Sequence, residues 1–106
     1  MGNIKVTETS LQDAYIVEQA VYGDHRGFFT ESYSREDFNE AGLTYDFVQD
    51  NHSLSVEAGV LRGLHFQKGE HAQTKLIRVI TGAVYDVIVD LRKNSPTYGK
   101  WEGFIL

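Results

Sequence analysis

Residues 75–90 read KLIRVITGAVYDVIVD, two runs rich in β-branched residues with Gly82 between them. Both runs, Lys75–Ile80 and Val84–Leu91, mix apolar with polar or charged positions. That mixture suits strands of a barrel wall whose inner face carries functional groups. Because glycine tolerates the backbone conformations of tight turns, Gly82 fits a hairpin connection. The stretch therefore predicts two strands joined by a turn at Gly82.

Similar runs recur on both sides of this stretch, and turn-forming residues separate most of them. They cover Ile4–Glu8, Tyr15–Val21, Phe28–Tyr33, Tyr45–Gln49, Val60–Phe66 and Trp101–Leu106. Many short strands of this kind are typical of an all-β sandwich or barrel. The sequence therefore predicts an all-β fold.

One short helix interrupts the pattern of strands. Ser34 places a capping hydroxyl three residues before Asp37, and Gly42 stands where a short helix would stop. We predict a helical turn over Arg35–Ala41.

Composition limits the organisation and the partners. A chain of 106 residues with 42% hydrophobic and 24% charged residues is long enough for one domain, so we predict a single domain over residues 1–106. The net charge of -5 argues against general nucleic-acid binding, which needs an excess of Lys and Arg. No apolar run is long enough to span a bilayer, and no secretory signal or cysteine is present, so a cytoplasmic location is expected.

The densest polar cluster lies within Val60–Gln67. Ideal strand alternation would send Arg62 and His65 to opposite faces, but a bulge at Gly63 would turn both toward one cavity. The alternative is a core histidine bonded to backbone with an outward arginine. This stretch alone does not separate the two interpretations.

The wider spacing resembles the first cupin motif, in which a glycine leads to His-x-His, then Glu, then a closing glycine. Here Gly59, His65, Gln67, Lys75 and Gly82 stand at those positions. Gln67 replaces a histidine and Lys75 stands where the glutamate would be. Because an ammonium donates hydrogen bonds and repels a cation, we predict no metal and no cofactor. A metal-dependent cupin oxygenase is the weaker alternative, and Lys75 speaks against it.

A lysine facing a histidine across a β cavity suits the formation of an enolate beside a ketone. His65 would be the base, and Lys75 would stabilise the oxyanion. The alternative for Lys75 is an exposed lysine at a strand end, which is the commoner fate of lysine.

Several motifs together resemble dTDP-4-dehydrorhamnose 3,5-epimerases, from about Asp24 to the end of the chain. The motifs are Asp24–Glu31, Phe47–Ser53, Gly59–Gln67, Lys75-Leu76 and Asp90–Gly99, in the family's order. The resemblance implies a metal-free cupin-type jelly roll. It also implies an enzyme that inverts C3 and C5 of dTDP-4-keto-6-deoxyglucose on the way to dTDP-rhamnose.

The resemblance also implies a role for each matching residue. His65 would be the general base, and Lys75 would stabilise charge at the C4 oxygen. The substrate contacts would be Arg62, Asn51 and Gln49 at the sugar and diphosphate, and Arg26, Phe29 and Glu31 on a segment that reaches a neighbouring subunit. A homodimer with shared sites is therefore implied. The alternatives are a turn ion pair between Arg26 and Asp24, a core position for Phe28 or Phe29, and turn-capping roles for Asn51 or Ser53.

The family's chain continues beyond the position matching Leu106. The resemblance places there the second cupin motif, a tyrosine acid on the opposite face of the sugar and the partner of the base histidine. We therefore expect a jelly roll that is incomplete at the C-terminus, and a chain that is inactive alone. A catalytically silent sugar-nucleotide binding or assembly module is the second hypothesis.

Overall fold

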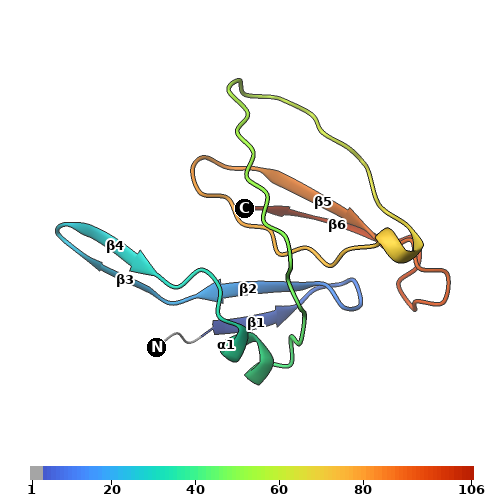
Figure 1. The fold of residues 1–106 in the computed structure, drawn as a ribbon. Helices are drawn as coiled ribbons and strands as arrows, with labels where there is room; N and C mark the ends of the chain where they lie inside the picture. The colour runs from blue at the N-terminus through green and yellow to red at the C-terminus, as the bar shows by residue number, and fades with distance from the viewer. Residues whose placement is uncertain (1–3) are drawn as a thin grey trace. The chain divides into compact units, whose positions relative to one another are not determined.

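The computed structural model describes residues 4–106 (Figure 1). The chain divides into two units. The first unit comprises residues 4–44 and 78–106, and the second comprises residues 45–77. All strands found among the described residues belong to the first unit. The second unit contains one short 3-10 helix, η1 (Gly69–His71), in otherwise irregular chain.

The strands of the first unit form three antiparallel hairpins. They pair β1 (Ile4–Glu8) with β2 (Tyr15–Gln19), β3 (Val21–Asp24) with β4 (Gly27–Thr30), and β5 (Tyr85–Val89) with β6 (Trp101–Ile105). Five of the predicted runs therefore contain strands. The predicted run Tyr15–Val21 divides at Ala20 between β2 and β3, and the run Phe28–Tyr33 ends as a strand at Thr30.

The predicted helical turn is confirmed as α1 (Arg35–Glu40). The Asp37 backbone amide donates to Ser34 Oγ at 3.3 Å, which satisfies one of the free N–H groups at a helix start. Gly42 follows with φ of +86°, a conformation that favours glycine after a helix. No helix among residues 4–106 is long and apolar enough to cross a membrane.

A small apolar core lies in the first unit. Phe38 of α1 is 2% exposed, and its ring packs against the Tyr33 ring in a T-shaped arrangement with the centroids 4.8 Å apart. Leu11, in the β1–β2 turn, and Leu43, after the helix, are also buried. The helix is therefore held by its one buried face, as expected for an element too short to be stable alone.

Three predicted strands, Tyr45–Gln49, Val60–Phe66 and Lys75–Ile80, are wrong as assignments for this chain. The predicted hairpin between Lys75–Ile80 and Val84–Leu91 is wrong too, because β5 pairs with β6 in the register Val87↔Gly103. A strand exists only through its hydrogen-bonded neighbour, and β-forming residues have no strong intrinsic preference without one. Among the described residues these three runs meet no such neighbour. Gly82 does adopt the positive φ (+86°) of a turn.

A dense polar network joins the β5–β6 loop to the β1–β2 loop, and we call its five residues the clasp: Asp13, Asp90, Arg92, Ser95 and Thr97. Asp90, whose side chain is 2% exposed, accepts hydrogen bonds from the Arg92 guanidinium and from the Ser95 and Thr97 hydroxyls. Arg92 also donates to Asp13 Oδ2 at 2.8 Å and to the Gln12 carbonyl at 2.6 Å. The clasp therefore cross-links two hairpins that are far apart in sequence.

Candidate functional site

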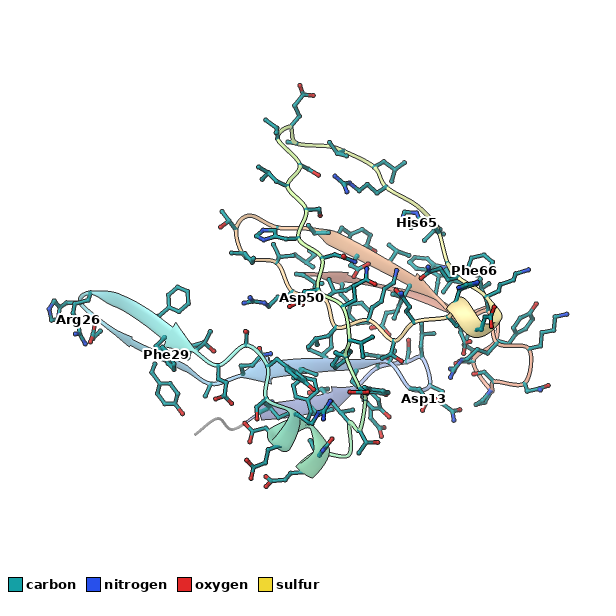
Figure 2. All side chains as sticks on the ribbon, viewed as in Figure 1. Asp13, Arg26, Phe29, Asp50, His65 and Phe66 are labelled. Atoms are coloured by element: carbon teal, nitrogen blue, oxygen red, sulfur yellow. The ribbon has the colours of Figure 1, made fainter. Side chains whose placement is uncertain are left out.

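The two predicted catalytic residues both lie in the second unit, on irregular chain that leaves them exposed. Figure 2 shows His65 on this segment. Among residues 4–106, no hydrogen bond or ion pair joins the predicted base His65 to Lys75. The backbone places both side chains where a ligand in solution can reach them. The catalytic roles expected of His65 and Lys75 stay a prediction.

Arg62 and His65 lie on either side of Gly63, which has φ of +110°. Only glycine adopts this conformation without strain, so the backbone turns sharply between the two side chains. Arg62 Nη2 donates to Ser55 Oγ at 3.1 Å across the unit's own loop. The predicted bulge at Gly63 is wrong in form, because these residues belong to no strand, although the glycine does redirect the chain.

Gln49 and Asn51 are brought together by the local backbone. Gln49 Nε2 donates to Asn51 Oδ1 at 3.1 Å, and both side chains are exposed. This bond leaves the Gln49 carbonyl oxygen and the Asn51 amide group for further hydrogen bonds. The pair can therefore offer both a donor and an acceptor to the hydroxyl groups of a sugar.

Two of the other predicted ligand contacts, Arg26 and Phe29, lie in the first unit on the hairpin of residues 21–30, which we call the β3–β4 arm. Figure 2 shows Arg26 at the turn of the arm and Phe29 farther along β4. An open cavity of about 240 Å³ is lined by Tyr22, Asp24, Arg26, Gly27, Phe28 and Phe29. It combines aromatic rings with the Arg26–Asp24 ion pair, and the rings offer faces on which a planar base can stack.

Arg26 is held by Asp24. Its Nη2 lies 2.5 Å from Asp24 Oδ2 and its Nε lies 3.1 Å from the same oxygen. The Arg26 side chain lowers the pKa of Asp24, and the hydrogen bond from the Arg26 backbone amide adds to the effect. The ion pair anticipated as the alternative is therefore present. It orients the guanidinium and still leaves the Arg26 side chain 79% exposed.

The aromatic residues of the arm are not core residues. Phe28 is 75% exposed and Phe29 is 58% exposed, so the alternative of an inward ring is wrong for this chain. Glu31 follows the arm and is half-buried. Within residues 4–106, His and acidic side chains form no cluster of three or more that could hold a metal ion.

The sequence did not predict the clasp. Residues 90–99 match a family motif, but the motif alone gives no role to Asp90 or Arg92. A signal was available, because Asp, Ser and Thr beside a proline are typical of side-chain capping in a turn. The contact between Arg92 and Asp13, however, joins residues 79 positions apart, and no local sequence pattern predicts it.

Comparison with known proteins assigns the chain to one family. The family model "dTDP-4-dehydrorhamnose 3,5-epimerase" matches residues 8–106. The enzyme of that name from Salmonella typhimurium is 56% identical over 92% of this chain and 54% of its own length. That from Methanothermobacter thermautotrophicus is 55% identical over 97% of this chain and 55% of its own length. The chain thus spans about half the length of the curated relatives it matches.

Solved structures agree. The epimerase from Bacillus anthracis, solved with TDP and PPi bound, is 59% identical with a TM-score of 0.93, over 97% of this chain and 59% of that one. The Legionella pneumophila enzyme, in complex with dTDP-4-keto-L-rhamnose, is 47% identical with a TM-score of 0.90, over 98% of this chain and 55% of that one. These neighbours confirm the predicted all-β, cupin-type fold class. The chain belongs to the dTDP-4-dehydrorhamnose 3,5-epimerase family.

Proposed function

We propose that this chain supplies the general base and most of the substrate contacts of an epimerase. The enzyme converts dTDP-4-keto-6-deoxyglucose to dTDP-4-keto-L-rhamnose. The observation that carries the proposal is the family match over residues 8–106, which includes the exposed segment bearing His65 and Lys75. The Legionella relative, which was solved with the keto sugar bound, supports the substrate class.

In the proposed reaction His65 takes the proton from the carbon beside the C4 ketone. The electron pair of the broken C–H bond forms a C=C double bond to C4, and the π electrons of the C4=O bond move onto the oxygen, which gives an enolate. The Lys75 ammonium donates to that oxygen, where negative charge develops. An acid on the opposite face returns a proton to carbon, and the same sequence at the other centre completes the inversion.

The binding roles follow the placement of the polar groups. Arg62, with the paired Gln49 and Asn51, holds the sugar and the diphosphate, because a guanidinium and amide groups match anionic and hydroxyl oxygens. Arg26, Phe29 and Glu31 contact the nucleotide. The open cavity of the β3–β4 arm supports this division, since it offers aromatic faces beside a held guanidinium.

We further propose a cytoplasmic homodimer in which the arm of one copy serves the site of the other, each copy forming one domain. An arm whose residues 21–29 are all exposed has apolar surface available for a partner. No metal or cofactor takes part in the proposed reaction.

Turnover needs an acid on the face of the sugar opposite His65, and we assign that role to no residue among 4–106. We therefore expect residues 1–106 to bind dTDP without turning over the keto sugar. We expect turnover from a chimaera in which the chain is continued by the part of the Bacillus anthracis enzyme beyond the matched region. We refer to this protein below as the chimaera.

Solvent exchange tests the proposal. In deuterium oxide the chimaera should incorporate deuterium into dTDP-4-keto-6-deoxyglucose at C3 and C5, as read by mass spectrometry and NMR. Calorimetry should show dTDP binding to the chain alone. Binding without exchange by the chimaera would favour the catalytically silent sugar-nucleotide module, and the absence of both would remove this ligand class.

A further inference from the structure

The β3–β4 arm joins the rest of its unit at its base, where the described residues become less exposed. Residues 21–29 are exposed throughout, whereas Gln19, Ala20, Thr30 and Ser32 at the base are half-buried. Among the strands of residues 4–106, β3 and β4 pair only with each other, in the register Tyr22↔Phe29. The direction in which the arm projects therefore depends on the contacts at the base.

Two side-chain hydrogen bonds connect the two chain segments at the base of the arm. The Thr30 hydroxyl donates to the Ala20 carbonyl at 2.7 Å, and Gln19 Nε2 donates to the Ser32 carbonyl at 3.0 Å. The first bond joins the end of β4 to Ala20, the residue between β2 and β3, and the second ties the end of β2 to the chain that leaves β4. Together they join the arm to the β1–β2 hairpin on both of its chain segments.

A small change in angle at these two bonds produces a larger displacement at the far end of the arm. A strand of four residues is about 13 Å long, so a tilt of about 10° at the base moves the turn by ~2 Å. A misplacement of about 1 Å can cost a binding or catalytic group much of its effect. The position of Arg26 and Phe29 is therefore sensitive to the geometry around Ala20.

We propose that Thr30 and Gln19 are positioning residues that aim the β3–β4 arm at the nucleotide. This inference rests on the proposed function, in which Arg26 and Phe29 contact dTDP. Neither residue touches the ligand in this account. Each acts by fixing the joint between β2 and β3, so the loss of either bond should weaken dTDP binding through the arm.

A double-mutant cycle on the chain tests the proposal, with the dissociation constant for dTDP measured by calorimetry. Arg26→Ala should raise it about tenfold, as expected for a lost charge-assisted contact. Thr30→Val and Gln19→Leu should each raise it about fivefold, and Arg26→Ala should have little further effect in either background. Thr30→Ser keeps the hydroxyl and should restore the affinity. Thr7→Val, an exposed strand position on β1, is the matched control.

A second measurement makes the proposal independent of ligand binding. Residual dipolar couplings of the backbone amides should fit one orientation for both hairpins, β1–β2 and β3–β4, in the unsubstituted chain and in Thr30→Ser. In Thr30→Val the arm should need its own, less ordered orientation while β1–β2 stays unchanged. Couplings that fit one orientation in Thr30→Val and Gln19→Leu would overturn the inference.

The outcomes separate the inference from the proposed function. If Arg26→Ala leaves dTDP binding unchanged, or the unsubstituted chain binds no dTDP, the nucleotide role of the arm is wrong, and the couplings alone decide the role of the joint. If Arg26→Ala weakens binding but Thr30→Val and Gln19→Leu do not, the inference is wrong and the proposed function stands.

Discussion

The Asp90 carboxylate is buried and is satisfied entirely by neighbouring donors. Arg92 binds it through Nε and Nη2, each at 3.0 Å, and the Ser95 and Thr97 hydroxyls lie at 2.5 Å and 2.6 Å. The Arg92 guanidinium, followed by the two hydroxyls, holds the pKa of Asp90 well below its ordinary range. The carboxylate is therefore stabilised in its charged form, and the clasp depends on that charge.

We predict that the clasp makes the chain sensitive to acid. Because the pKa of Asp90 is lower in the folded chain than in the unfolded one, its contribution is complete above about pH 4 and is lost as the pH falls further. Urea unfolding between pH 7 and pH 2.5 should show this loss. Asp90→Asn should lower stability at pH 7 and flatten the acid slope.

Asp50→Asn, which removes the same charge at an exposed position, is the control for net charge. A chain that keeps its steep acid slope in Asp90→Asn would contradict the assignment.

Arg62 is predicted to act in binding. A charge-assisted hydrogen bond to an anion contributes about 1.5 to 3 kcal/mol, so Arg62→Ala should raise the dissociation constant for dTDP by roughly 10- to 100-fold. Its present partner is the neutral Ser55 hydroxyl, which it can leave at little cost. Calorimetry measures the change. Lys5→Ala removes one positive charge from β1 and should leave binding unchanged; an equal effect there would mean that only net charge matters.

Helix α1 shows what local sequence can determine. Its start depends on one hydroxyl three residues before the amide it caps, and its end depends on a glycine, so both were readable from the chain alone. The hairpins were readable only in part. Runs of β-forming residues located β1, β5 and β6 well, but the partner of β5 could not be read, because pairing depends on neighbours distant in sequence.

The cap of α1 gives a prediction for this element. Ser34→Ala should lower the free energy of unfolding by about 1 kcal/mol, because the Asp37 amide loses its acceptor. Ser34→Asp keeps an acceptor and should retain the stability of the parent. Urea denaturation followed by circular dichroism measures both. Equal losses in the two variants would show that the bond at 3.3 Å stabilises nothing.

At the scale of the whole molecule, the predicted site residues are divided between the two units of the chain. Arg26, Phe29 and Glu31 lie on or beside the arm in the first unit, and the remaining five lie in the second unit. Motif spacing identified these residues but carried no information about which would meet. The local pairs, Arg26 with Asp24 and Gln49 with Asn51, are formed within a few residues. That His65 and Lys75 act together on one bound substrate remains a prediction.

We predict that two copies share each site. In the chimaera, Arg26→Ala and His65→Ala chains should each be weakly active or inactive at low substrate concentration. Mixed and refolded in equal amounts, they should regain about a quarter of the parent activity, because half the dimers are mixed and each has one intact site. Sedimentation velocity should show dimers throughout. Activity that never exceeds that of the separate variants would place Arg26 and His65 in the same copy.

The most direct test of the account is proton exchange at His65. We predict that His65→Ala in the chimaera lowers deuterium incorporation at C3 and C5 by roughly 10²- to 10⁴-fold while dTDP binding stays nearly unchanged, since a base acts in the transition state. His71→Ala, an exposed histidine of the same segment, is the matched control and should exchange normally. Exchange at the parent rate in His65→Ala, with dTDP still bound, would contradict the central claim that His65 is the base.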